Sequence, residues 1–385
     1  MHKTKLLQLL KTLSMKEQNS FKDYVFSPYF NKNKKIQTLC SQLLDSAPTF
    51  DQSTLKKQYL YPLLFGPKAY NELQINNVIS DLLQLLYGFL AQQNISQNPL
   101  LNKYHCLHEL IEREDIQHSQ RISKSLAQML EKRPIRNFQY HFHNKQLHEQ
   151  LVRHHLTTAM RSRDQSLQQH SDSLDLYYFS NKLRIACDMT SRNIVTQANY
   201  QCEHLDYLLD YYKKNIDTYQ AEPCITVYYK ALKMIRDGTE DSYRDFKNYI
   251  GEHLSLFPIE ELRILYVYLQ NFCILKSNSG NRGYYRELRD LYDIILEKGI
   301  IFKNGFLSQW TYKNIVTVGI RLRDYDWTEE VIHKFNDSLL LEEQANAAAY
   351  NLAALFYARK EYKKALQQLH NVEFIDTSYH TGAKI

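Results

Sequence analysis

Apolar residues recur along the second half of the chain at the three- and four-residue spacing that places them on one face of an α-helix. The clearest case is segment 350–376, in which two short amphipathic helices flank a tight turn. In the second helix of this pair, the residues expected to face inward are separated by steps of three, four and three positions. The same steps occur at three places upstream. We predict four such faces: Tyr243, Phe246, Ile250 and His253; Tyr285, Leu288, Tyr292 and Ile295; Thr328, Val331, Phe335 and Ser338; and Tyr362, Ala365, Leu369 and Val372.

The two C-terminal hairpins also agree in their first helices, at a shift of 34 residues. Gly319 corresponds to Ala353, which is also small, and Leu322 corresponds to Phe356, which is also large. A small residue lets the second helix approach closely, and a large neighbour fills the remaining gap. Since such a hairpin cannot bury its apolar face alone, we expect consecutive hairpins to stack.

Segment 350–376 resembles a tetratricopeptide repeat (TPR). The letters "YNLA" stand at the family's Leu-small pair, Phe356 at its aromatic position and "YKKAL" at its Tyr-x-x-Ala step, while Val372 replaces the usual Ala. Segment 316–343 resembles the family more weakly. The resemblance implies an all-α fold, an α/α superhelix built as a right-handed α-solenoid of TPR-like helical hairpins.

The first part of the chain, residues 1–98, is predicted to be an N-terminal helical bundle. Ser14 and Glu17 form a capping-box pattern at the start of one helix. Three more helices are expected at 35–44, at 53–61 and, after a cap at Asn71, at 72–94. This unit fits a helical cap on the hairpins that follow, or a winged-helix-like DNA-binding unit. The exposed positions of the last helix carry no Lys or Arg, which a recognition helix needs, so we favour the cap.

The remainder is predicted to contain degenerate helical hairpins at 99–220 and TPR-like repeats at 221–385. The last residues, "DTSYHTGAKI", fit a turn and the start of another first helix. We therefore expect the array to be cut short at the C-terminus.

Composition supports long helices and a packed core. Of 385 residues, 44% are hydrophobic, and only 10 are glycine, which sheet turns require. The N-terminus lacks the pattern of a signal peptide, and no run of 18 apolar residues occurs. The six cysteines are scattered, which indicates reduced thiols rather than a metal or redox motif. We expect a cytoplasmic protein without membrane contact.

The net charge of +6 is concentrated between residues 121 and 163, where nine Lys or Arg face two Glu. Such a region can attract nucleic acid or an acidic surface, or can be the solvated face of a long helix. The candidate basic patch consists of Arg121, Lys132, Arg133, Arg136, Arg153, Arg161 and Arg163.

The sequence lacks the signatures of catalysis and of cofactor binding. It has no phosphate loop and no Gly-x-Ser-x-Gly elbow. His141, His148 and His155 lie seven residues apart on one helical face, a spacing of about 10.5 Å that is too long for any two to chelate one ion. We predict no catalytic site, no cofactor and no metal, and interpret these histidines as a polar face that protonates below about pH 6.5.

In TPR-like arrays a partner binds the concave face lined by the first helices. Asn at such a position can bond a peptide backbone, and Lys or Arg can hold an acidic side chain. The same positions also fit ordinary seam or surface residues. The family resemblance assigns groove positions to Tyr350, Asn351 and Tyr357 in the last unit and to Lys313, Thr317 and Arg323 in the preceding one.

The leading functional hypothesis is a non-catalytic protein–protein interaction scaffold or adaptor that binds a protein or peptide on this concave face. The alternative is a transcriptional regulator or nucleic-acid-binding protein that uses the N-terminal helical unit or the basic region 121–163. An enzyme with a site in the groove is the third hypothesis, and it has the least support.

Overall fold

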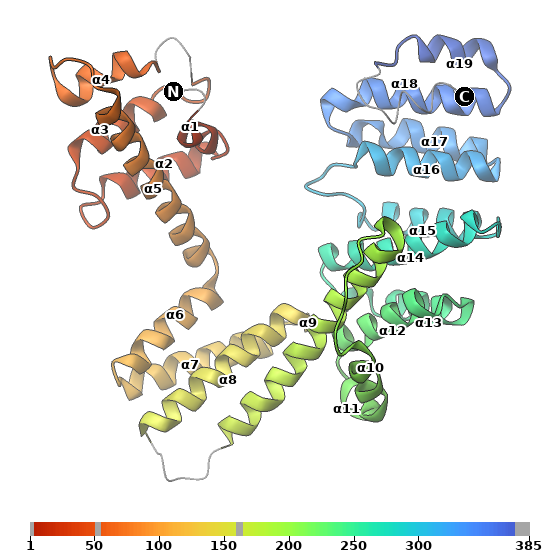
Figure 1. The fold of residues 1–385 in the computed structure, drawn as a ribbon, viewed down its shortest axis with the longest axis horizontal. Helices are drawn as coiled ribbons and strands as arrows, with labels where there is room; N and C mark the ends of the chain where they lie inside the picture. Colours follow the sequence, from red (N-terminus) through yellow and green to blue (C-terminus); the bar gives the residue numbers. More distant parts are fainter. Residues whose placement is uncertain (1–3, 51–54, 159–164, 374–385) are drawn as a thin grey trace. The chain divides into compact units, whose positions relative to one another are not determined.

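The computed structural model describes residues 4–50, 55–158 and 165–373. Within these ranges the protein is all-α, with nineteen α-helices, two short 3₁₀ helices and no β-strand (Figure 1). The predicted all-α class is therefore confirmed. None of the described helices combines the length and the apolar character that crossing a bilayer requires. The chain forms two compact units, Met1–Leu126 and Ala127–Ile385, and each is described by itself.

The N-terminal unit is built from short helices around one long helix. The first five helices enclose a continuous apolar core whose buried residues run from Leu6 to Phe89. This core lies inside the predicted bundle of residues 1–98, while the compact unit continues to Leu126. The helices are α1 (Lys5–Leu10), α2 (Met15–Phe26), α3 (Lys34–Leu44), α4 (Lys57–Phe65), α5 (Glu72–Gln97) and α6 (Pro99–Glu112), and α7 (Ile116–Glu131) crosses the boundary between the units.

The two predicted helix caps of this unit agree with the structure, whereas the helix predicted from residue 53 begins at Lys57. The Ser14 hydroxyl accepts from the Glu17 amide at 3.3 Å, and the Glu17 carboxylate accepts from the Ser14 amide at 2.8 Å. The Asn71 side chain accepts from the Gln74 amide at 3.1 Å. These bonds satisfy amide groups that the first turn of a helix leaves without a partner.

Two elements of the N-terminal unit differ from the prediction. Helix α1 was not predicted, because six residues are too few to show a helical period, yet Leu6, Leu7 and Leu10 are fully buried. Helix α4 runs through Pro62 to Phe65 instead of ending at residue 61. The turn begins at Gly66, whose φ of +73° a glycine adopts without strain.

The C-terminal unit is a series of helical hairpins in which each hairpin contacts the next. Long helices α8 and α9 pair first, and α9 packs on α12. From α12 onwards, consecutive pairs lie one above another along the chain (Figure 1). The helices are α8 (Phe138–Thr158), α9 (Ser166–Thr196), α10 (Leu205–Lys214), α11 (Ile216–Tyr219), α12 (Pro223–Asp237), α13 (Glu240–Glu252), α14 (Ile259–Asn278), α15 (Tyr284–Glu297), α16 (Gln309–Leu322), α17 (Tyr325–Phe335), α18 (Leu341–Ala358) and α19 (Tyr362–Leu369).

The predicted inward faces of the second helices are largely buried in this unit. Phe246, Leu288 and Val331 are among their buried members. The prediction is wrong for Tyr362, which is 58% exposed, because it is the first residue of α19 and its ring lies against that of exposed Tyr357. The predicted further helix within "DTSYHTGAKI" lies outside the described residues.

Side chains connect consecutive hairpins across their seams. The Trp327 indole donates to Asp293 of α15 at 2.9 Å. The Tyr325 hydroxyl donates to the Ala358 carbonyl at 3.2 Å, and Arg359 pairs with Glu329 at 2.6 Å. We call this set the inter-hairpin bonds. Because each joins only neighbours, the stack is held together one seam at a time.

The small residue predicted at position 319 is required by the packing of α16 on α17. A Cβ atom on Gly319 would lie 2.1 Å from the Thr328 hydroxyl and 3.0 Å from two ring carbons of Trp327. Thr328 is buried and its hydroxyl donates to the Asp324 carbonyl, so it is held in place. No larger residue fits at position 319 without separating the two helices.

We predict that Gly319→Ala destabilises the protein by about 1–3 kcal/mol, because overpacking outweighs the gain in helix propensity. The matched control is Gly251→Ala in α13, where a Cβ meets nothing within 4 Å. This control should stabilise by roughly 0.5–1 kcal/mol. Urea denaturation followed by circular dichroism measures both, and a Gly319→Ala variant as stable as the wild type would contradict the packing described.

Candidate partner-binding groove

A groove of about 810 Å³ crosses three consecutive hairpins of the C-terminal unit. It lies where the first helices α14, α16 and α18 end and the second helices begin. We call its buried and half-buried small and aliphatic residues the floor, and its exposed residues include arginines and Tyr357. The lining residues are Ser277, Gly280, Arg282, Tyr285, Thr317, Ile320, Arg321, Arg323, Tyr325, Tyr350, Ala353, Ala354, Tyr357, Ala358, Ala365 and Leu369.

Four of the six residues assigned to a groove by the sequence line this one: Thr317, Arg323, Tyr350 and Tyr357. The Lys313 ammonium lies 4.9 Å from the centre of the Tyr350 ring, next to the groove.

Asn351 lies elsewhere. It is 1% exposed, and its amide donates to the Ala347 carbonyl of its own helix at 2.9 Å. Its side chain is therefore already used inside the protein, and the predicted contact with a peptide backbone has no support from its position.

Three arginines give the groove a positive charge. Arg282, Arg321 and Arg323 are exposed and have no ion-pair partner among the described residues. The described groove lining contains no Asp or Glu. Neighbouring arginines that face the seams are paired, as Arg359 is with Glu329. Within the described parts of the chain, no carboxylate pairs with these three arginines.

Tyrosines supply most of the large apolar surface of the groove. Tyr357 is 54% exposed, and Tyr285 and Tyr325 are partly buried. The Tyr325 hydroxyl is held by the Ala358 carbonyl, which fixes its ring at the groove side. Tyr and Arg are the residue types that contribute most to protein–protein binding, because they offer large contact area together with polar groups.

The sequence did not reveal Arg282, Tyr285, Arg321 and Tyr325 as groove residues. Arg282 and Tyr285 follow a joint where the repeat spacing is 42 or 43 residues instead of 34, so the TPR register does not reach them. Arg321 and Tyr325 flank the turn after α16, which the first-helix pattern does not include. The sequence feature that could have indicated these groove residues is the excess of arginine at consecutive hairpin turns.

The candidate basic patch is only partly defined by the structure. Lys132, Arg133, Arg136 and Arg153 are exposed in the C-terminal unit. Arg136 lies over the Tyr140 ring at 5.5 Å, and Arg153 is 3.7 Å from Glu149. Arg121 is exposed in the N-terminal unit. Arg161 and Arg163 lie outside the described residues.

The histidine row on α8 differs from the predicted polar face. His141 is 1% exposed, and its Nε2 atom lies 3.5 Å from the Glu222 carboxylate. Burial, together with the charge of Arg136, lowers the pKa of His141 to about 4. The prediction of protonation below pH 6.5 is therefore wrong for His141, because its burial within the C-terminal unit removes it from water. Among the described residues, no three His, Cys, Asp or Glu side chains converge on a possible metal site.

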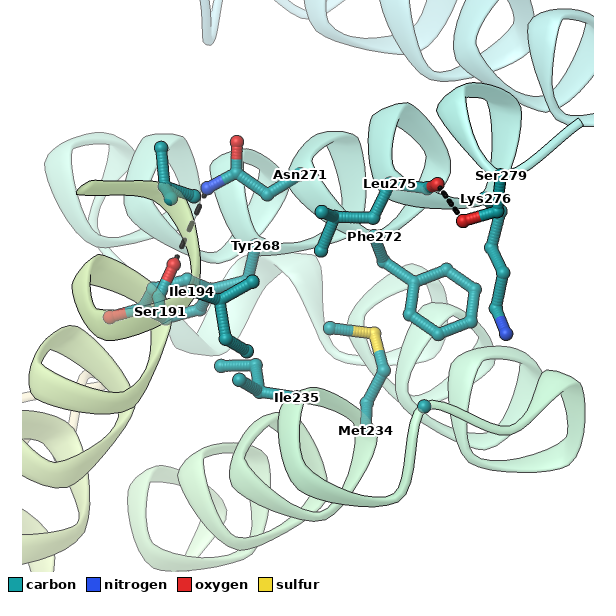
Figure 2. Close-up of a pocket in the computed structure, with 12 residues that line it drawn as sticks. Ser191, Ile194, Met234, Ile235, Tyr268, Asn271, Phe272, Leu275, Lys276 and Ser279 are labelled. Carbon is teal, nitrogen blue, oxygen red and sulfur yellow. Dashed lines mark hydrogen bonds between the residues drawn. The ribbon is translucent and has the colours of Figure 1, made fainter. Parts of the chain in front are cut away.

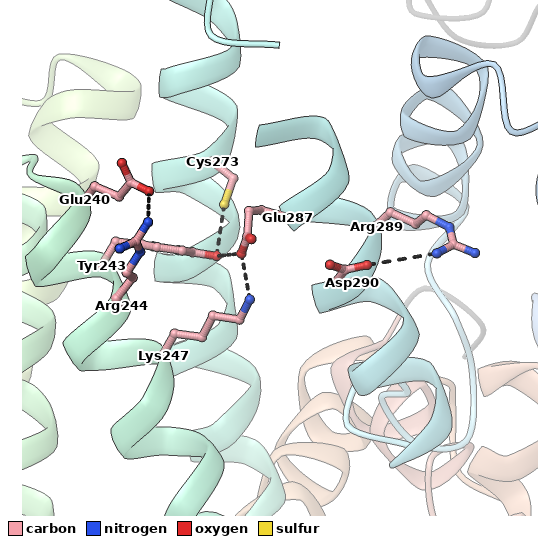
Figure 3. A network of polar contacts seen from close by, with 8 residues as sticks. All are labelled: Glu240, Tyr243, Arg244, Lys247, Cys273, Glu287, Arg289 and Asp290. Atoms are coloured by element: carbon pink, nitrogen blue, oxygen red, sulfur yellow. Dashed lines mark hydrogen bonds and ion pairs between the residues drawn. The ribbon is translucent and has the colours of Figure 1, made fainter. Parts of the chain in front are cut away.

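A polar network joins α13, α14 and α15 (Figure 3). The Tyr243 hydroxyl donates to Glu287 at 3.0 Å, and Lys247 donates to the same carboxylate at 2.6 Å. Burial raises the pKa of the Cys273 thiol to about 12, so the thiol stays protonated. Because these groups bond to one another, the network connects helices instead of presenting a reactive group.

A smaller apolar pocket of about 200 Å³ lies between the ends of α9 and α12 and one side of α14. Figure 2 shows Ile194, Met234, Ile235, Phe272 and Leu275 converging on it. At its polar edge, the Asn271 amide of α14 donates to the Ser191 hydroxyl of α9 at 3.4 Å. The pocket lacks the charged side chains of the larger groove, except for one lysine at its rim.

Comparison of the chain with protein-family models, with curated proteins and with solved structures finds no match. Function must therefore be inferred from the side chains themselves.

We predict that the free energy of unfolding falls by up to about 3 kcal/mol as pH is lowered from 6.5 to about 4, because of His141. In that window the unfolded chain binds a proton at this residue and the native state does not, so acid favours unfolding. His141→Leu should flatten the dependence, whereas His105→Leu at an exposed position should not. Urea denaturation at a series of pH values measures this, and equal slopes for His141→Leu and the wild type would refute it.

Proposed function

We propose that the protein is a non-catalytic interaction scaffold whose C-terminal hairpins form an α-solenoid and bind an extended segment of a partner protein in the groove. The observation that carries the proposal is the convergence of Thr317, Arg323, Tyr350 and Tyr357 on one surface. The resemblance to tetratricopeptide repeats implies a binding face at these positions. That all four line one groove supports that assignment.

The composition of the groove also favours a peptide over a small substrate. The groove spans three hairpins and is open along its length, with an alanine-rich floor between tyrosines. An extended chain rises about 3.3 Å per residue, so several side chains can lie along such a surface. Nucleophilic or acid–base groups are absent from the described lining, apart from tyrosine, serine and threonine hydroxyls.

We place this interaction in the cytoplasm. All six cysteines lie in the described part of the chain and none forms a disulfide. Unpaired thiols of this kind are usual in a reducing compartment.

Nucleic-acid binding is the second candidate, and the exposed Lys132, Arg133 and Arg136 favour it. The N-terminal unit gives it less support. The exposed residues of α5 include Glu72, Gln74 and Asp81, and this helix contains no Lys or Arg. It thus lacks the cations with which a recognition helix contacts phosphates and guanine.

We predict that Ala354→Trp, which fills the groove floor, reduces partner capture at least about tenfold. The matched control is Ala345→Trp, at an exposed position of the same helix outside the groove. Capture from a cytosolic extract, quantified by mass spectrometry, compares the variants with the wild type. If the wild type and Ala354→Trp capture the same proteins to the same extent, the groove is excluded as the binding site. Heparin retention lost with Arg133→Gln and Arg136→Gln, without groove-dependent capture, would favour nucleic-acid binding instead.

A further inference from the structure

The three groove arginines are placed by irregular backbone at the hairpin joints. Arg282 lies in the turn after α14, where its amide donates to the Gly280 carbonyl at 3.0 Å. Arg321 is in the last turn of α16. Arg323 caps that helix with a φ of +58°, in the left-handed region where glycine or asparagine is usual. The arginines thus come from two different joints and reach the same groove.

The end of α16 explains a positive charge at positions 321 and 323 but not at position 282. A cation in the last turn or at the C-terminal cap of a helix is favoured by the helix dipole, and this accounts for the charge of Arg321 and of Arg323. Arg282 lies on the N-terminal side of α15, where the dipole favours an anion and disfavours a cation. The backbone of Arg323 has a φ of +58°, a conformation in which glycine or asparagine is usual and other residues are rare. The helix ends therefore give no reason for the charge of Arg282, and the backbone at position 323 favours glycine or asparagine over arginine.

In the described residues around them, the nearby carboxylates are paired with other arginines. Arg289, one turn into α15, is paired with Asp324 at 3.1 Å, and Arg359 is paired with Glu329. These carboxylates face the seams and are already used. The groove lining itself contributes no carboxylate among the described residues.

From this arrangement we propose that the partner is an acidic segment: an extended peptide whose Asp or Glu side chains pair with Arg282, Arg321 and Arg323, and whose intervening apolar side chains lie on the alanine floor. This inference rests on the proposed function and specifies the chemistry of its ligand. An arginine fork can bind a carboxylate through two parallel hydrogen bonds, which gives orientation as well as affinity. The tyrosines flank the backbone of the segment and exclude water from these pairs.

The probe is a fluorescein-labelled peptide of three Asp-Glu-Leu repeats, with its Asn-Gln-Leu and Lys-Lys-Leu counterparts as comparisons. Fluorescence anisotropy with the full chain measures binding. We expect the acidic peptide to bind at least about tenfold more tightly than the neutral one, and the lysine peptide not to bind. Raising the salt concentration should weaken acidic binding, since exposed charges are screened.

The decisive variant is Arg282→Gln, Arg321→Gln and Arg323→Gln combined, which should lose at least about tenfold in affinity for the acidic peptide. The matched control removes the same charge outside the groove: Lys233→Gln, Arg286→Gln and Lys298→Gln, all at exposed positions. This control should bind like the wild type. An equal loss in both triple variants would show only a net-charge effect and would overturn the inference.

Other outcomes separate this inference from the proposed function. Equal binding of the neutral and acidic peptides overturns the acidic specificity. Binding of a phosphoserine peptide without binding of the Asp-Glu-Leu peptide overturns the assignment to carboxylates. If Ala354→Trp abolishes partner capture while the arginine triple variant captures normally, the groove binds a partner and the acidic inference fails. If the arginine triple variant no longer binds the acidic peptide but Ala354→Trp still captures partner proteins like the wild type, the acidic-peptide site is supported and the proposed function fails.

Discussion

The hairpins of this chain each have an apolar face that they cannot bury alone, and the C-terminal unit follows from that constraint. Burial of such faces is the main favourable term in folding, at roughly 25 cal/mol for each Å² of apolar surface. Each second helix must therefore lie close to its own first helix and to the next hairpin. Gly319 shows how close: the hydroxyl of Thr328 occupies the space in which a side chain would begin. The inter-hairpin bonds then fix the seam that this contact creates.

Stacking of this kind determines where the groove lies. The first helices end at one edge of the unit, and their turns bring Arg282, Arg323 and Tyr357 to the same surface. Residues that face the seams are bonded across them, as Trp327 is with Asp293. Some turn residues are also bonded across a seam, as Arg359 is with Glu329, whereas Arg282 and Arg323 have no ion-pair partner among the described residues. This difference separates the structural part of the unit from its candidate binding surface.

Sequence patterns predicted the parts of the fold that depend on local spacing. The caps at Ser14 and Asn71 and the buried faces around Phe246 and Leu288 are set by residues a few positions apart. Four of the residues assigned to a groove line the same one, because the two last hairpins share a 34-residue register. The groove assignment missed Arg282, since the register changes upstream. The burial of His141 and of Asn351 was also not predictable, because both depend on which distant helix covers them.

The groove is assembled from three hairpins whose mutual contacts are all between neighbours. The width of the groove therefore depends on the geometry of two consecutive joints. A small rotation at each joint changes the separation of Arg282 and Tyr357 more than it changes any single contact across a seam. The groove is for this reason the feature of the unit whose shape depends most on the exact angle of each seam, although every helix that lines it is the same at any such angle.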